Sequence, residues 1–201
     1  MCGRFSLLAD LSTIVNTFAI ERVATTYQGD SNFSPGRDIY AVIHEGGNTL
    51  VSLRWGLIPA WAKDPAIGKN LFNARAETVT TKPSFRRAFF NRRCLIPAQG
   101  FYEWPKKGEK RGPLFFSLKS RLLFGLAGLY ETWVSPEGKS VTTCTIITTA
   151  ANTLIEPYHE RMPVIIPAGE EGKWLHKGET TEVLLTLLRP YPAEDMVLES
   201  R

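Results

Sequence analysis

Residues that favour turns divide the chain into many short β-rich runs, and this limits the folds open to it. The plainest example is a hairpin, in which Glu45-Gly46-Gly47-Asn48 joins the β-rich runs 38–44 and 49–55. Further β-rich runs follow at 94–97, 99–104, 114–118, 122–133, 140–149 and 163–166. Helical patterns occur in the stretches 7–18, 84–90, 172–175 and 181–188, and Asn152 to Ile155 could start another helix before Pro157. We therefore predict an α+β fold, with a curved, mainly antiparallel β-sheet or barrel and flanking short helices.

Composition agrees with one domain over residues 1–201. The chain is 43% hydrophobic and 22% charged, which is ordinary for a globular protein long enough to bury a core. Its net charge of +4 is compatible with a polyanionic partner but is weak evidence for one. We see neither a basic-plus-apolar leader nor an apolar run of membrane-spanning length. We expect a soluble intracellular monomer with no membrane partner, cytoplasmic and nucleoid-associated if the source is bacterial.

Three cysteines argue against a disulfide framework, and no Cys-x-x-Cys pair suggests zinc. Cys94 and Cys144 lie in apolar, strand-like runs and are expected to be buried. We expect no metal and no cofactor. Basic residues cluster twice, and a solvated face is the expectation for each cluster. The clusters are Arg86, Arg87, Arg92 and Arg93, and Lys106, Lys107, Lys110 and Arg111.

Cys2 follows Met1 directly, and aminopeptidases remove Met1 when the next residue is small. The mature chain would then carry an α-amine and a thiol on adjacent atoms. An α-amine titrates near pH ~7.7–8.0, so a useful fraction is unprotonated at neutral pH. Such a 1,2-aminothiol captures aldehydes, because the amine forms an imine on which the thiol closes a five-membered ring. The plain alternative is a cysteine at position 2 with Met1 retained or the terminus frayed.

Glu103 lies in a strand-like run of large aromatics, and alternation places it with Phe101 on one face and Tyr102 with Trp104 on the other. A carboxyl group among aromatics has a raised pKa, which suits general acid–base chemistry near neutral pH. The alternative is a glutamate at a strand end that reaches solvent.

Other polar side chains could take part. His159 precedes a predicted strand and could move protons at physiological pH, or be a structural histidine whose hydrogen bonds are satisfied.

Asn73 and Arg75 would face the same way in an extended segment, where an amide can hold an amine or sugar oxygen and a guanidinium can bind phosphate. Arg4 would share a face with Cys2 if the terminus is a strand. The alternatives are that Asn73 is a turn residue and that Arg4 and Arg75 are solvated surface side chains.

Five motifs occur in order and together resemble the SRAP family (SOS-response-associated peptidases), which shield abasic sites in DNA by covalent crosslinking. They are Met1-Cys2-Gly3-Arg4-Phe5, Trp55-Gly56-Leu57-Ile58-Pro59, Asn73-Ala74-Arg75-Ala76-Glu77-Thr78, residues 93–104 and His159-Glu160-Arg161-Met162-Pro163. The match spans almost the whole chain, and each motif is weak alone.

The resemblance implies that Cys2 attacks the aldehyde of the abasic sugar and ends as a thiazolidine. It implies that Asn73 orients the amine and sugar, Glu103 is the acid/base, and His159 is a second proton shuttle. It places Arg4, Arg75 and Arg161 near DNA phosphates, Thr148 in the pocket and Trp61 as an aromatic wedge. The partner would be single-stranded DNA, or a junction of single- and double-stranded DNA, containing an abasic site.

Two other functions stay open. A cysteine peptidase could use Cys2, His159 and Glu103 for acyl transfer, perhaps on its own leader, although only Met1 precedes Cys2. A DNA-binding module without chemistry would bind in a salt-sensitive manner, would be indifferent to the lesion and would form no adduct.

Overall fold

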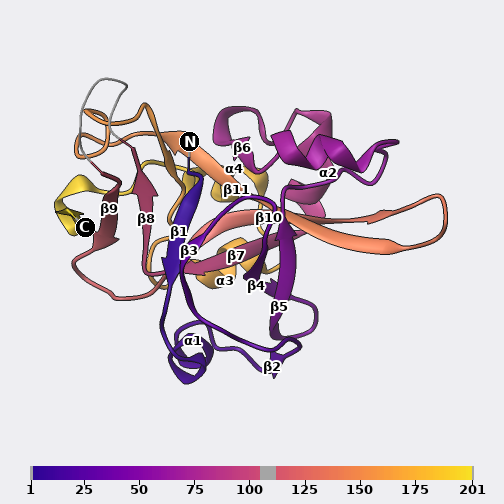
Figure 1. Cartoon of the computed structure of the whole chain (residues 1–201), viewed down its shortest axis with the longest axis horizontal. Helices are drawn as coiled ribbons and strands as arrows, with labels where there is room; N and C mark the ends of the chain where they lie inside the picture. The colour runs from indigo at the N-terminus through magenta and orange to yellow at the C-terminus, as the bar shows by residue number, and fades with distance from the viewer. Residues whose placement is uncertain (1, 105–111, 201) are drawn as a thin grey trace.

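The computed structural model describes residues 2–104 and 112–200, which form two β-sheets with short helices around them (Figure 1). One sheet has five strands in the order β13-β9-β8-β1-β3. The other has eight, in the order β12-β11-β10-β7-β4-β5-β2 with β6 beside β11. The predicted α+β class is confirmed.

The strands are β1 (Arg4–Leu7), β2 (Arg22–Val23), β3 (Asp30–Phe33), β4 (Asp38–His44), β5 (Asn48–Trp55), β6 (Asn73–Arg75), β7 (Arg93–Ala98), β8 (Gly100–Glu103), β9 (Leu114–Leu118), β10 (Phe124–Val134), β11 (Ser140–Ala150), β12 (Arg161–Pro163) and β13 (Met196–Ser200). The α-helices are α1 (Leu11–Thr17), α2 (Pro83–Asn91), α3 (Glu171–Leu175) and α4 (Thr181–Thr186). Three 3-10 turns complete the set: η1 (Pro65–Asn70), η2 (Ala76–Thr78) and η3 (Ala193–Asp195).

Most strand pairs are antiparallel, as predicted. The hairpin of β4 and β5 closes with His44 opposite Asn48. Within the described ranges, the parallel pairs join β11 to β5, β11 to β6 and β2 to β5. The far ends of β10 and β11 extend beyond the rest of the fold as a two-stranded arm (Figure 1).

Two predicted elements have other boundaries. The first helix begins at Leu11 rather than near residue 7, because Asp10 accepts a hydrogen bond from the Thr13 amide and caps it there. The strand predicted at 163–166 ends at Pro163. Beyond it the chain crosses from β11 to β10: the Val164 amide donates to Ile147, and the Ile166 amide donates to Gly125.

Gln99 is the point at which the chain passes from the eight-stranded sheet to the five-stranded one, because it alone separates β7 from β8. Its amide donates to the carbonyl of Ser6, and its side-chain oxygen accepts from the amides of Leu8 and Ala9. The ladder of β1 and β8 then runs from Ser6 opposite Gly100 to Arg4 opposite Tyr102. Gln99 therefore anchors one end of the ladder, and Cys2 and Glu103 lie just beyond its other end.

Aromatic contacts join the two sheets. Phe5 of β1 lies 5.5 Å from Trp55 of β5, measured between ring centroids. Phe116 of β9 lies 6.0 Å from Tyr158, the residue before His159. These contacts hold the beginning of β1 and the segment before β12 against one core. Cys94 and Cys144 are fully buried in that core, as predicted.

The cluster of arginines at the end of α2 is not simply a solvated face. Arg93 is 6% exposed, and its guanidinium donates to the carbonyls of Phe89, Trp174 and His176, which ties α2 to the segment around α3. Arg92 pairs with the buried carboxylate of Glu131. The cluster Lys106, Lys107, Lys110 and Arg111 lies outside the described residues.

Replacement of Arg93 by methionine should lower the free energy of unfolding by about 3 kcal/mol, because buried carbonyls lose charged donors. Urea denaturation measures this effect. Arg86→Met is the matched control, since Arg86 is exposed on the same helix and its loss should cost less than about 0.5 kcal/mol. Equal midpoints for the two variants would contradict a structural role for Arg93.

Candidate active site

Cys2 is buried against Glu103. Its side chain is 0% exposed, and the amide of Arg4 donates to its sulfur. Burial raises the pKa of the Cys2 thiol, and the negative charge of Glu103 raises it further. The thiol is therefore held in its neutral form beside a carboxyl group.

Glu103 points into the protein. It is 3% exposed while Trp104 is 45% exposed, so the predicted alternation is confirmed and the alternative of a solvent-facing glutamate is wrong. Burial raises the pKa of the Glu103 carboxyl to about 7. Both protonation states are therefore populated near neutral pH, as an acid–base group requires.

His159 is half-buried, and the Arg161 amide donates to its Nδ1 at 2.9 Å. Nδ1 also lies 3.2 Å from the Arg161 carbonyl, but the shorter contact makes Nδ1 the acceptor and assigns the proton of the neutral ring to Nε2. Burial lowers the pKa of His159 below its ordinary value, so the neutral ring predominates at pH 7. The site therefore holds a neutral imidazole with an Nε2–H donor.

Asn73 lies in β6, which pairs in parallel with β11, so the extended segment expected around it is present. Its side-chain NH₂ donates to the carbonyls of Phe72 and Ile146, at 3.1 and 3.4 Å. Its Oδ1 is buried and has no hydrogen-bond partner among the described residues. A buried acceptor without a partner is costly, which suits a site that receives an N–H or O–H group from elsewhere.

Arg161 is fixed by a carboxylate that the sequence analysis did not single out. Its guanidinium bonds both oxygens of Glu77, at 2.6 and 3.0 Å, and the carbonyl of Thr148 at 2.6 Å. Thr148 is buried in β11, opposite Arg75 of β6. Glu77 belongs to the motif that begins at Asn73, but no sequence signal links it to Arg161, which lies 84 residues further along the chain.

Three predicted DNA-binding residues lie on the exterior. Arg75 is exposed, and Trp61 is 59% exposed in the loop between β5 and η1. Arg4 does not share a face with Cys2, because β1 begins only at Arg4. The exposed side chain of Arg4 instead bonds Asn32 and lies over the ring of Trp104.

The structure thus brings the predicted residues together in two groups. Cys2 and Glu103 lie just beyond one end of the β1–β8 ladder in the five-stranded sheet, and Asn73, Thr148, His159 and Arg161 lie around the end of β11 in the other sheet. The described ranges contain no group of three His, Cys, Asp or Glu side chains that could hold a metal ion. Nor does any helix within them have the length and apolar character needed to cross a membrane.

These features define an α+β protein with a buried cysteine–carboxylate pair, a neutral histidine and an arginine-rich rim. The chain belongs to the family described as SOS response associated peptidase (SRAP), whose sequence profile matches residues 1–200. The predicted family resemblance is confirmed.

Relatives and solved structures agree with this assignment. The chain is 47% identical over 201 residues to the abasic site processing protein YoqW of Bacillus subtilis, covering 98% of this chain and 90% of the relative. It is 30% identical to the abasic site processing protein HMCES of Xenopus tropicalis, covering 76% of this chain and 54% of the relative. A crystal structure of a Bacteroides thetaiotaomicron protein, 27% identical, superposes with a TM-score of 0.91 and covers 98% of this chain and 90% of that one.

Proposed function

We propose that this protein processes abasic sites in single-stranded DNA by forming a covalent adduct through Cys2 after Met1 is removed. Met1 lies outside the described residues. The observation that carries the proposal is the buried Cys2 beside Glu103, whose pKa of about 7 suits proton transfer during aldehyde capture. The names of the relatives support the same lesion as substrate.

The reaction proceeds in three steps: ring opening, imine formation and ring closure. The cyclic hemiacetal of the abasic sugar opens to an aldehyde when a proton leaves the C1′ hydroxyl and one reaches the ring oxygen. The Cys2 amine adds to C1′, and the carbinolamine loses water with a proton from Glu103, giving an imine. The thiol then adds to the imine carbon, and its proton passes to the nitrogen to complete the thiazolidine. Tethering favours this last step, because effective molarities of intramolecular reactions reach ~10⁵–10⁸ M.

The surrounding residues have matching roles. Neutral His159 offers its Nε2–H to a sugar oxygen during ring opening and can recover the proton afterwards. Asn73 offers its unpartnered Oδ1 to an N–H of the Cys2 amine. Arg4, Arg75 and Arg161 would contact phosphates, while Trp61 would stack on a neighbouring base.

The peptidase alternative is less well supported. A cysteine protease needs a thiolate, which a nearby imidazolium stabilises. Here the pKa of the Cys2 thiol is raised and that of His159 is lowered, so both groups favour their neutral forms. Ring closure on the imine needs no preformed thiolate, because the tethered thiol can pass its proton to the imine nitrogen as the S–C bond forms.

Mass spectrometry tests the proposal directly. The purified protein should lack Met1, and incubation with an oligonucleotide carrying an abasic site should give a product of the two summed masses less one water. A protein that retains Met1 and forms no adduct would contradict the proposal. Binding that is indifferent to the lesion and sensitive to salt would favour the module without chemistry.

Glu77→Gln should slow adduct formation about three- to tenfold, because a neutral amide cannot hold the Arg161 guanidinium with two charged bonds. The free energy of unfolding should change by less than about 1 kcal/mol, since Glu77 is exposed. Single-turnover crosslinking and urea denaturation measure the two effects. Glu21→Gln, which removes one exposed carboxylate away from the site, is the control, and equal rates for both variants would argue against a positioning role for Glu77.

A further inference from the structure

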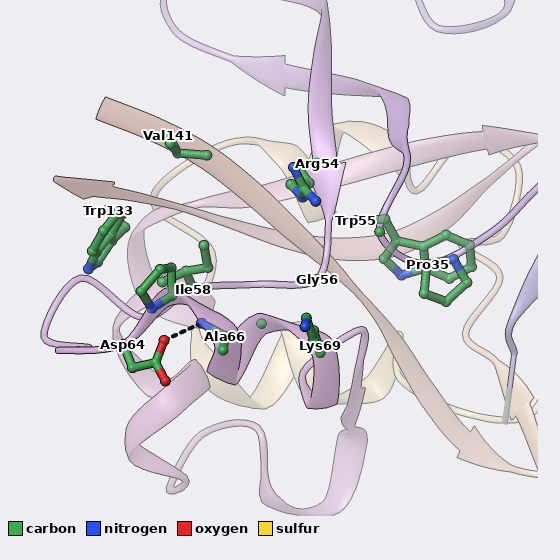
Figure 2. Close-up of a pocket in the computed structure, with 13 residues that line it drawn as sticks. Pro35, Arg54, Trp55, Gly56, Ile58, Asp64, Ala66, Lys69, Trp133 and Val141 are labelled. Atoms are coloured by element: carbon green, nitrogen blue, oxygen red, sulfur yellow. Dashed lines mark hydrogen bonds between the residues drawn. The ribbon is translucent and has the colours of Figure 1, made fainter. Parts of the chain in front are cut away.

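A cavity lies apart from the residues to which the proposed function gives a role. Its volume is about 550 Å³, within the range of small-molecule sites. It is bounded by the turn at Pro35, the end of β5, the η1 segment and the outer part of the β10–β11 arm (Figure 2). None of the roles assigned above to the active-site residues involves the residues that line this cavity.

The floor of the cavity is formed by two glycines whose backbones touch. A Cβ atom at Gly56 would lie 2.7 Å from the Gly68 carbonyl oxygen, and a Cβ atom at Gly68 would lie 2.7 Å from that of Gly56. Gly56 also has a φ of +136°, which favours glycine. Side chains are therefore excluded from the floor, and the space above it stays open.

The walls combine apolar surface with two cations. Trp133 gives its Nε1–H to the Ala62 carbonyl at 2.7 Å, so only its apolar ring is left to line the cavity beside Ile58. Arg54 and Lys69 border the cavity from opposite sides, with Gly56 between them in the view of Figure 2. Both are exposed, and neither has an ion pair within the described residues.

One carboxylate also lines the cavity. An oxygen of Asp64 accepts the Ala66 amide at 2.8 Å and caps η1 (Figure 2). The cations still outnumber it by two to one, so the cavity suits an anion that carries a flat apolar group.

The cavity adjoins the proposed lesion site. The indole of Trp55 lines the cavity and donates to the Phe72 carbonyl at 2.7 Å, and the same carbonyl accepts from Asn73. On its other side, the cavity shares Asp64 and Ala66 with the hollow beneath Trp61. The cavity therefore lies between Asn73 and the hollow that Trp61 lines, so a strand that runs from the lesion toward Trp61 meets it on the way.

We propose that the cavity binds a nucleotide of the damaged strand on one side of the abasic site. The base lies against Trp133 and Ile58, and the flanking phosphates are held by Arg54 and Lys69. This inference rests on the proposed function. It adds a subsite that makes affinity depend on the number of nucleotides beside the lesion.

Non-covalent affinity tests it without requiring the covalent reaction. Fluorescence anisotropy compares two single-stranded oligonucleotides containing an unreactive tetrahydrofuran lesion, one long and one with a single nucleotide on each side. Arg54→Ala with Lys69→Ala should weaken binding of the long oligonucleotide about tenfold and reduce its salt slope by ~1.4, since two phosphate contacts are lost. Binding of the short one should not change.

Two comparisons complete the design. Arg22→Ala with Lys177→Ala removes the same charge from exposed positions outside the cavity and should leave the length dependence intact. Removing the base from the nucleotides on one side of the lesion should weaken wild-type binding about tenfold, because base stacking is lost.

An unchanged affinity for the long oligonucleotide in the Arg54/Lys69 variant would overturn the subsite, as would equal losses for both oligonucleotides. If base removal on either side has no effect, the cavity holds no base and the proposal fails. Absence of an adduct on a reactive abasic site, with this length dependence intact, would instead reject only the covalent chemistry.

Discussion

Cys2→Ala should reduce the yield of a heat-stable adduct with abasic DNA to background, a loss of at least about a hundredfold. The variant retains an α-amine after Met1 removal and can still form an imine, but no thiol is present to close the ring. Borohydride reduction should therefore trap a product that is absent without it. Denaturing electrophoresis with and without borohydride measures both species.

Cys94→Ala is the matched control, because it removes another buried thiol and should leave the adduct yield unchanged. A permanent extension before Cys2 is the complementary variant, since it keeps the thiol but converts the amine to an amide. It should abolish both the adduct and the trapped imine. A heat-stable adduct in either Cys2→Ala or the extended protein would exclude the thiazolidine.

Glu103→Gln should slow adduct formation about 10²- to 10⁴-fold, which is the usual contribution of a general acid–base group. The carboxyl group loses the proton that it donates as the pH rises through about 7, so the ratio of the wild-type rate to the variant rate should fall over this range. Taking the ratio removes the pH dependence of the Cys2 amine, which both proteins share. Single-turnover rates between pH 5 and 9, a range of about two units on either side of that pKa, measure the difference.

The same substitution should raise the free energy of unfolding at high pH although it slows the reaction. The pKa of Glu103 in the fold is above its ordinary value of 4.5, so its stabilising contribution is present at low pH and is lost as the pH rises through about 7. Glutamine cannot ionise, so Glu103→Gln should be more stable than the wild type above pH 7, by up to about 3 kcal/mol. A variant that is less stable at pH 8 and equally fast would show that Glu103 serves packing alone.

The fold class could be predicted from turns and alternation within short segments. The strand boundaries were predicted less well where pairing with a distant part of the chain determines them. The β4–β5 hairpin could be predicted because its turn and alternation lie within one short segment. By contrast, β6 is three residues long and exists because β11 pairs with it from far along the chain. The strand predicted at 163–166 stops early for the same reason, since its neighbours change at Val164.

The residues of the candidate site were visible as motifs, but their partners were not. Nothing in the sequence indicates that Glu77 holds Arg161, or that Arg93 binds backbone carbonyls instead of solvent. The tautomer of His159 depends on a single backbone amide, and the isolated Oδ1 of Asn73 depends on how its NH₂ is occupied. Such details require coordinates, because they are set by hydrogen-bond geometry rather than by residue type.

The anchoring of Gln99 has a consequence for how the reactive groups could be tuned. Cys2 immediately precedes β1 and Glu103 ends β8, and the side chain of Gln99 fixes the register of these two strands from their far end. A substitution at Gln99 would contact neither reactive group, yet it would loosen the pairing that sets their separation. The spacing of nucleophile and proton donor is thus adjustable from the opposite end of the sheet, a remote handle for engineering this scaffold toward other aldehydes.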